Sequence, residues 1–411
     1  MIRILPASSP DALALFGRRV TRDPDLQRQV GEIVRGVRRN GDAALVRYAR
    51  RFDGLDDDIE LPLDEARRLA VTAPAGIRRA VAACARNLRR VARAQMPRSV
   101  RVAPVRGVVI EHVVSPLARV GCYVPGGRYP LPSSLLMTAV PAQVAGVAEI
   151  IATCPRIDAV VAAAAIEAGV TRLFRLGGAH AIAALAYGTA RVPRVDKIVG
   201  PGNRYVAAAK AAVAGDCPID FEAGPTELVW ATSAARPEWV ARDLIAQAEH
   251  DPDARAFLVT TSRREAEAVR AAARRLAPTG GIAAAALAAN GAAILARSRA
   301  EMLDIVNRLA PEHLATDDEW IVAQRPLAGT VFVGQWAPPA AGDYATGSNH
   351  VLPTAGAARF RGGLNAADFV RVVAVQRVTR TGLRAIAGPA VAMARVEGLA
   401  AHAGSIEARR P

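Results

Sequence analysis

The stretch RVGCYVPGG (residues 119–127) joins a short run of apolar residues to a proline–glycine turn. Residues 172–178 and 196–203 repeat this order, and alanine-rich helical stretches separate the three segments. A succession of strand, glycine turn, helix and strand is typical of parallel α/β units. The sequence therefore predicts an α/β fold in this part of the chain.

The pattern continues on both sides of this region. Further apolar or β-branched runs, each a predicted strand, lie at residues 107–111, 256–260, 292–295 and 329–333. Residues 10–96 instead place apolar side chains three and four positions apart, which predicts helices. The tail after Asn365 is predicted to be helical again. We expect two α/β layers with helical ends.

The composition fits a folded protein of two domains. The chain has 411 residues, 51% hydrophobic and 22% charged, which excludes a disordered protein. Its four cysteines form no C-x-x-C pair, so neither a disulfide scaffold nor a zinc finger is predicted. Residues 1–19 lack the apolar core of a signal peptide, and no stretch reaches the roughly 20 apolar residues of a membrane span. We expect a soluble protein of the cytoplasm.

The formal net charge of +15 raises the alternative of an arginine-rich nucleic-acid-binding protein. The excess is spread along the chain, with lysine only at Lys197 and Lys210. Aromatic residues make up 4%, too few for base-stacking platforms. The charge therefore favours anionic small ligands such as a dinucleotide, and we expect no nucleic acid and no membrane as partners.

Six histidines narrow the search for catalytic chemistry. Gln247 and His250 share one face of a predicted helix end, where they form either half of a metal site or a solvated polar terminus. Glu312 and His313 follow a proline at an element boundary. An imidazole there suits a proton acceptor near neutral pH, but a structural histidine gives the same pattern. The residues alone leave both alternatives open.

The irregular stretch of residues 341–354 is rich in glycine and polar side chains, as loops at functional sites often are. Within it, Asp343 is a candidate metal ligand, and His350 fits an internal hydrogen-bonding role. Glu397 and His402, close to the end of the chain, give no local signal of function.

Glycines after two predicted strands are candidate phosphate-binding turns. Residues 177–178 and 200–203 each precede a predicted helix, whose first backbone N–H groups suit phosphate, but both also suit ordinary turns. No G-x-G-x-x-G follows a strand, and the P-loop, G-x-S-x-G and H-E-x-x-H patterns are absent. The sequence thus argues against P-loop hydrolases, α/β-hydrolases with that motif and HExxH metalloproteases.

From about residue 10 to the C-terminus, the chain resembles the histidinol dehydrogenase family. The similarity is carried in unbroken order by residues 119–127, 177–189, 197–210, 223–227, 247–253, 307–314, 342–354 and 397–402. The resemblance implies oxidation of L-histidinol through L-histidinaldehyde to L-histidine with two NAD⁺, the last steps of histidine biosynthesis. It also implies two Rossmann-like parallel α/β/α domains in an intertwined homodimer.

By this resemblance, one Zn²⁺ per subunit is held by Gln247, His250, Asp343 and, from the partner subunit, His402. His313 matches the family's general base, and Glu312 matches the residue that activates water on the aldehyde. The positions that contact substrate in the family are Thr226, Gln247, His250, Glu312, His313, Asp343, Glu397 and His402. Those that contact NAD⁺ are Tyr123, His180 and Asn203. Mn²⁺ or Co²⁺ suits the same nitrogen and oxygen ligands.

The resemblance also divides the chain. It implies an N-terminal helical extension (1–19) and a first α/β domain with the metal and catalytic residues (20–121 and 228–363). A second α/β domain on the NAD⁺ side (122–227) and a C-terminal helical extension that reaches the partner's site (364–411) complete it.

The sequence departs from the family at two positions. His180 stands where most relatives have glutamine, and we expect it to alter the affinity for NAD⁺. Thr226 stands where many have serine and keeps the hydroxyl group. A paralogous zinc- and NAD-dependent dehydrogenase of another small alcohol, such as sulfopropanediol, is the alternative enzyme.

Overall fold

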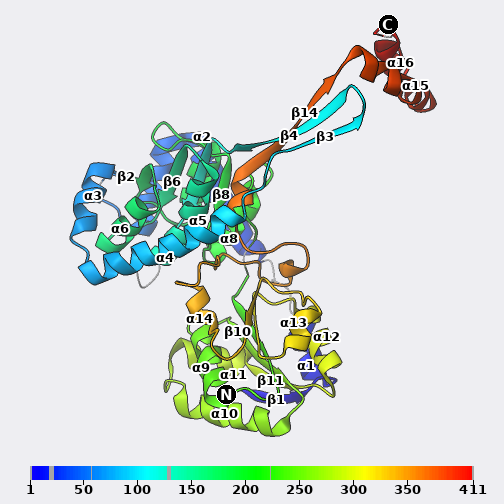
Figure 1. Cartoon of the computed structure of the whole chain (residues 1–411). Coiled ribbons are helices and arrows are strands. Elements are labelled where there is room, and N and C mark those ends of the chain that lie inside the picture. The colour runs from blue at the N-terminus through cyan, green and yellow to red at the C-terminus, as the bar shows by residue number, and fades with distance from the viewer. Residues whose placement is uncertain (1, 18–22, 57, 127–130, 223, 410–411) are drawn as a thin grey trace.

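A parallel sheet of six strands forms the core of one half of the molecule (Figure 1). The computed structural model describes residues 2–17, 23–56, 58–126, 131–222 and 224–409. The strand order is β1-β11-β10-β9-β12-β13, and each neighbouring pair is parallel. The strands are β1 (Arg3–Pro6), β9 (Glu227–Ala231), β10 (Arg255–Thr260), β11 (Ala292–Leu295), β12 (His313–Thr316) and β13 (Thr330–Val333).

Helices cover both faces of this sheet because successive strand residues point to opposite sides and both sides are apolar. Leu228 and Leu258 face one side, which packs on α9 (Pro237–Ala248), α10 (Arg263–Leu276) and α11 (Gly281–Asn290). Val229 and Val259 face the other, which packs on α1 (Pro10–Gly17), α12 (Arg299–Leu309) and α13 (Glu319–Ala323). This half is therefore an α/β/α sandwich.

The other half is built on a five-stranded sheet of order β2-β7-β6-β5-β8. Its strands are β2 (Glu60–Leu61), β5 (Arg119–Tyr123), β6 (Glu149–Thr153), β7 (Arg172–Phe174) and β8 (Lys197–Val199), and only β2 runs antiparallel to its neighbour. One face packs on α3 (Leu63–Val71), α4 (Ala75–Ala94), α5 (Pro132–Ala145) and α6 (Ala159–Glu167). The opposite face packs on α2 (Pro24–Tyr48), α7 (Gly178–Tyr187) and α8 (Arg204–Val213).

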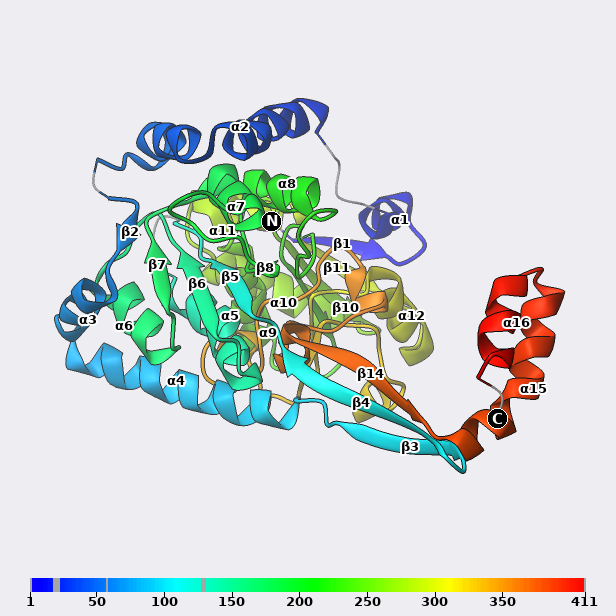
Figure 2. The ribbon, with the colours of Figure 1, turned by 90° about the horizontal axis from the view of Figure 1, so that it is seen from above.

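An arm leads away from the two sheets (Figures 1 and 2). It comprises the antiparallel strands β3 (Val100–Val105), β4 (Val108–Pro116) and β14 (Val370–Val378), followed by α15 (Arg380–Val396) and α16 (Ala400–Glu407). Short helical pieces lie elsewhere, namely η1 (Ala49–Asp53), α14 (Pro339–Gly342), η2 (Ala357–Arg359) and η3 (Ala366–Phe369). Within the described residues, no helix is both long and apolar enough to cross a membrane.

The predicted α/β class is confirmed, but the arrangement of the chain ends differs from the prediction. Residues 3–6 are not part of a helical extension, because they pair with β11 as the edge strand of the six-stranded sheet. The tail after Asn365 is not wholly helical. Its segment VRVVAVQRV (370–378) is β14, and its β-branched residues pair along the whole length of β4.

The structure also corrects two predictions about which sheet a segment belongs to. The run at 107–111 lies in β4 of the antiparallel arm rather than in an α/β layer. The helices between residues 24 and 94 pack on the five-stranded sheet, so residues 20–121 do not accompany the six-stranded sheet as the division of the chain assumed. Helix periodicity reveals which face is apolar, but not which sheet will cover it.

Candidate active site

The candidate catalytic residues meet at the amino edge of the six-stranded sheet. His313 is the first residue of β12, directly after Glu312, and Thr226 precedes β9. Helix α9 returns to the same edge and carries Gln247 in its last turn, with His250 just beyond its end. Parallel α/β sheets usually bind ligands at their carboxyl edge, so this placement is uncommon.

A chain of hydrogen bonds joins these side chains. The Gln247 amide nitrogen donates to the Thr226 hydroxyl, which donates to Oε2 of Glu312. The same Oε2 accepts the backbone N–H of Glu227 at 3.0 Å. The carbonyl of Glu227 lies 3.2 Å from Nδ1 of His313. Because a carbonyl only accepts, Nδ1 carries the proton and Nε2 has the free lone pair.

Burial sets the protonation of this group. It raises the pKa of Glu312 to about 7, against the lowering effect of the Thr226 and Glu227 hydrogen bonds and of the charge of His250. Burial likewise lowers the pKa of His313, so its imidazole is neutral near pH 7. A neutral imidazole with one free lone pair is a competent proton acceptor.

The loop of residues 341–354 brings Asp343 to this group. Its Oδ1 lies 3.9 Å from Nε2 of His313, and burial raises the pKa of Asp343 to about 6. His350 donates from Nδ1 to the carbonyl of Asp343 at 2.9 Å, as the sequence predicted for an internal histidine, and burial lowers its pKa to about 4. The imidazole of His350 therefore stays neutral and braces the loop.

The same loop is bonded to the other half of the molecule. Asn349 donates to the carbonyl of Met137 in α5 at 2.7 Å, and Asn87 of α4 donates to the carbonyl of Ala345 at 2.8 Å. Asp343 is therefore positioned by both halves at once.

Three of the four predicted zinc ligands are gathered here with donor atoms free. Within the described part of the chain, the amide oxygen of Gln247 and the imidazole of His250 have no hydrogen-bond partner, and the carboxylate of Asp343 lies against His313, with the charge of Glu312 also acting on it. His250 is exposed, yet close enough for its charge to lower the pKa of both His313 and His350. Two oxygens and a nitrogen suit Zn²⁺. In the described ranges, no three His, Cys, Asp or Glu side chains form a metal cluster.

The remaining predicted residues of this site, Glu397 and His402, are not brought to it within one chain. Both are exposed on α15–α16 at the far end of the arm (Figure 1).

The predicted NAD⁺ residues lie at the carboxyl edge of the five-stranded sheet. Tyr123 ends β5, Asn203 caps α8 after β8, and His180 lies in the first turn of α7 after β7. The Tyr123 hydroxyl accepts the N–H of Gly178 at 3.1 Å, and burial raises its pKa, so it is an uncharged phenol. This edge is where parallel sheets usually bind nucleotides.

His180 is almost fully buried, as is Tyr123, which is 3% exposed. The ring of His180 is 1% exposed, packs near Tyr48 and Phe52, and donates from Nε2 to Asp53 at 2.8 Å. The carboxylate of Asp53 also accepts the N–H of Gly177 at 3.0 Å. The imidazole therefore fastens η1 to the start of α7.

Sequence reasoning missed the buried pair of Lys210 and Asp220. Lys210 donates to the carbonyl of Gly200 at 2.9 Å and pairs with Asp220, which accepts the N–H of Gly200 at 2.8 Å. Gly200 has φ of +122°, and a Cβ there would lie 2.1 Å from the carbonyl oxygen of Tyr123. The one available signal was that Lys210 is one of two lysines in an arginine-rich chain.

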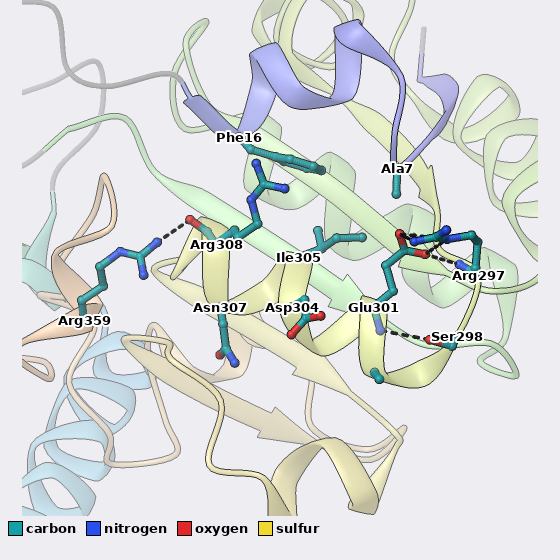
Figure 3. Close-up of a pocket in the computed structure, with 11 residues that line it drawn as sticks. Ala7, Phe16, Arg297, Ser298, Glu301, Asp304, Ile305, Asn307, Arg308 and Arg359 are labelled. Atoms are coloured by element: carbon teal, nitrogen blue, oxygen red, sulfur yellow. Dashed lines mark hydrogen bonds and ion pairs between the residues drawn. The ribbon is translucent and has the colours of Figure 1, made fainter.

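A separate pocket of about 630 Å³ lies between α1 and α12 and contains none of the candidate site residues (Figure 3). Its wall includes Phe16, over which the guanidinium of Arg308 lies 5.1 Å from the ring centre. Glu301 within it is already paired with Arg297. We assign it no part in the chemistry.

Comparisons with known proteins show which family the chain belongs to. The family model described as histidinol dehydrogenase matches residues 17–410. Histidinol dehydrogenase of Dechloromonas aromatica (strain RCB) is 42% identical over 415 residues, 97% of this chain and 95% of the relative. That of Methylococcus capsulatus is 43% identical over 418 residues, 98% and 95% of the two chains.

A solved structure gives the same result. The crystal structure of histidinol dehydrogenase from Elizabethkingia anophelis matches with a TM-score of 0.93 and 32% identity, over 100% of this chain and 98% of that one. Neither the nucleic-acid-binding alternative nor the paralogous dehydrogenase is supported. The chain belongs to the histidinol dehydrogenase family and is an NAD-dependent oxidoreductase acting on a CH–OH group.

Proposed function

We propose that this chain oxidises L-histidinol through L-histidinaldehyde to L-histidine, and that the residues at the amino edge of the six-stranded sheet perform the chemistry. The observation that carries the proposal is the hydrogen-bonded group of Thr226, Glu312 and His313, with Asp343 against the free nitrogen of His313. The five-stranded half would hold NAD⁺ through Tyr123 and Asn203, and NAD⁺ would accept the hydride.

His313 is the proposed general base. Its Nδ1–H is committed to the carbonyl of Glu227, so Nε2 is the atom that takes the proton of the alcohol. Burial keeps the imidazole neutral before the reaction.

Glu312 is the proposed base for the second oxidation. A pKa of about 7 lets the carboxylate take a proton from water near neutral pH and release it again. Thr226 and the amide of Glu227 hold Oε2, which leaves Oε1 as the atom for water on the aldehyde.

Gln247, His250 and Asp343 are the proposed zinc ligands of this chain. Their free amide oxygen, imidazole and carboxylate supply three donors, and a fourth must come from elsewhere. Bound Zn²⁺ would anchor and orient the amine and imidazole of the substrate. Helix α9, its following turn and the loop at Asp343 hold these donors near His313, the residue that would take the proton of the alcohol.

We further propose that His402 of the partner subunit is the fourth ligand and that Glu397 of the partner subunit contacts the substrate. The arm leaves apolar side chains exposed on its strands and on its helices, including Val102 of β3 (58%), Val372 of β14 (55%) and Val396 of α15 (84%). Apolar groups on an extended arm favour burial against a second copy of the chain.

The proposed function is tested by NADH formation from L-histidinol, with sulfopropanediol as the comparison substrate. L-Histidinol should give two NADH per molecule, and activity on sulfopropanediol alone would refute the assignment. Metal analysis of protein purified without added metal should find about one Zn²⁺ per subunit.

Two variants separate the roles of the bases. His313→Ala should lose turnover while keeping its zinc, and loss of the metal would show that its role is misassigned. Glu312→Gln should stop near one NADH per L-histidinol and release aldehyde, detectable with an aldehyde-trapping hydrazine. Two NADH at the unchanged rate would remove Glu312 from the second step.

A further inference from the structure

Both backbone groups of Glu227 are bonded to the proposed bases. Its N–H donates to Oε2 of Glu312 at 3.0 Å, and its carbonyl accepts Nδ1–H of His313 at 3.2 Å. Glu227 is the first residue of β9, a central strand between β10 and β12. Any shift of this one residue therefore moves the carboxylate of Glu312 and the imidazole of His313 together.

The side chain of Glu227 is held by a buried ion pair. Its carboxylate accepts Nη1 of Arg255 at 2.8 Å, and the two residues lie opposite one another on β9 and β10. Glu227 is 4% exposed and Arg255 is 9% exposed. Neither side chain is hydrogen-bonded to Glu312 or His313 in the described part of the chain, so the hydrogen bonds that link the pair to the site run through the backbone of Glu227. The two carboxyl groups also interact through space, since burial and the charge of Glu312 both raise the pKa of Glu227.

Arg255 also reaches a third element. Its Nη2 donates to the carbonyl of Leu15 in α1, and its guanidinium lies 5.2 Å from the ring centre of Phe257. Helix α1 is further held by the contact between the ring of Phe16 and the guanidinium of Arg308 (Figure 3). The planar guanidinium thus fixes β9 relative to α1, with two donors directed at two acceptors.

The stability of the fold does not by itself explain a charged pair at this place. Buried ion pairs lose hydration, and well-packed apolar side chains of similar volume often replace them without loss of stability. What an apolar pair lacks is directed hydrogen bonding, here from one guanidinium to the carboxylate of Glu227 and to the carbonyl of Leu15. Glu227 is bonded through its backbone to both proposed bases, so a side chain that fixes Glu227 also fixes the bases.

We propose that Glu227 and Arg255 are positioning residues of the reaction, which hold the backbone of residue 227 so that His313 keeps its Nδ1–H form and Glu312 its orientation. This inference rests on the proposed roles of His313 and Glu312. It also makes the docking of α1 part of the assembly of the site.

Steady-state kinetics of three variants test the pair. Arg255→Met leaves Glu227 buried without its cation and should lower both Tm and kcat. The double variant Glu227→Leu/Arg255→Met should recover Tm, because no unpaired charge remains, while kcat stays about ten- to a hundredfold low. KM for L-histidinol and NAD⁺ should stay within about twofold, since neither residue touches a ligand. Recovery of kcat together with Tm would show a purely structural pair.

A control removes a less buried ion pair of the other half, whose side chains are 32% and 33% exposed. Arg172 binds Glu60 through two hydrogen bonds of 2.8 and 2.6 Å between β7 and β2, away from the bases. Glu60→Leu/Arg172→Met should leave kcat unchanged. If the Glu227 double variant does not fold, Arg255→Lys takes its place. It keeps the charge but not the two-pronged geometry, so kcat should fall with little change in Tm.

The tautomer of His313 gives a second measurement that does not depend on turnover. Nitrogen-15 spectra of histidine-labelled protein, with His313 identified from the His313→Ala spectrum, should show the Nδ1–H form in the natural chain and a mixture in the double or Arg255→Lys variant. An unchanged tautomer with unchanged kcat would overturn the inference. Failure of the proposed function appears differently, as a natural chain that does not oxidise L-histidinol, and the spectra then decide the inference alone.

Discussion

The hydroxyl of Thr226 decides how two neighbouring side chains are oriented. It has one proton, and that proton goes to Glu312, so the hydroxyl oxygen accepts from Gln247. The nitrogen of the Gln247 amide is thereby fixed, and its oxygen is left for a metal. Threonine adds a methyl group to serine, which restricts the side-chain rotamer without changing the donor.

We expect Thr226→Val to disturb both functions of this hydroxyl, and Thr226→Ser to disturb neither. Valine keeps the shape but leaves Glu312 with fewer hydrogen bonds, which should cost about 1–3 kcal/mol of unfolding free energy. Zinc affinity should also fall, because the Gln247 amide is free to rotate. Urea denaturation and zinc titration check both effects, and a valine variant that behaves like the serine variant would contradict them.

Asp243 shows how a buried carboxyl makes stability depend on pH. It accepts the indole N–H of Trp230 at 2.9 Å, and burial raises its pKa to about 6 against the lowering effect of that bond. The folded state therefore holds the proton more tightly than the unfolded state does. This contribution favours folding at pH 4 and is lost as the pH rises through about 6.

Asp243→Asn should accordingly stabilise the protein in alkaline but not in acidic solution. The amide oxygen still accepts from Trp230, and no charge has to be buried. We expect a gain of about 1–3 kcal/mol at pH 8 and almost none at pH 4. Urea unfolding at the two pH values measures the difference, and an equal gain at both would show that desolvation is not the cause.

Single residues were predictable only as candidates. The sequence left Glu312 and His313 open between catalysis and structure, because their partners are Thr226 and Glu227, about 86 positions earlier in the chain. The roles came from the resemblance, and local patterns carry no information about such distant bonds. The buried state of His180 and its bond to Asp53, 127 positions away, were unpredictable for the same reason.

Helices and strands were easier to predict than which strands pair with one another. The runs at 119–124 and 256–260 are β5 and β10, because buried parallel strands are short, apolar and followed by turns. Pairing depends on contacts between strands far apart in sequence, so β1 at the edge of the sheet was missed. The same applies to β14, whose partner β4 lies more than 250 positions earlier.

The loop that carries Asp343 depends on one glycine. Gly347 has φ of +93°, and a Cβ there would lie 2.8 Å from the carbonyl oxygen of Asn87 in α4. Gly356 has a similar φ of +80°, but its nearest neighbours would lie 3.8 Å away. Alanine at either position would have a strained backbone because of the positive φ. Only at position 347 would its Cβ also collide with a neighbouring residue.

Gly347→Ala should therefore be more harmful than Gly356→Ala. The collision must push the loop away from α4, which should cost about 1–2 kcal/mol beyond the strain that both variants share, and should weaken zinc binding through Asp343. Thermal unfolding and zinc content compare the two proteins. Equal losses would mean that the loop position does not depend on this contact.

At the scale of the whole molecule, the proposed set of four zinc ligands is not gathered within one chain. Gln247, His250 and Asp343 lie near the amino edge of the six-stranded sheet, whereas His402 is exposed on α16 at the end of the arm (Figure 2). Under the proposal, this exposed histidine serves as a ligand when another copy of the chain brings its own site to it. The sequence suggested this through the resemblance alone, because an isolated terminal histidine has no local pattern.

Mixing two inactive variants decides whether the site is shared. His402→Ala and His313→Ala should each lack activity as homodimers. In a hybrid dimer, the His402→Ala chain keeps its own His313 and receives His402 of the partner subunit, so one of the two sites is complete. Random reassembly makes half of the dimers hybrid, and about a quarter of the natural activity should return.

The same mixture excludes the opposite arrangement. If His402 served its own chain, the His402→Ala subunit would lack a ligand and the His313→Ala subunit its base, so no hybrid site would be complete. Activity after unfolding, mixing and refolding in the presence of Zn²⁺ is the measurement, and His313→Ala refolded alone is the control. A mixture no more active than that control would mean that the arm does not complete the neighbouring site.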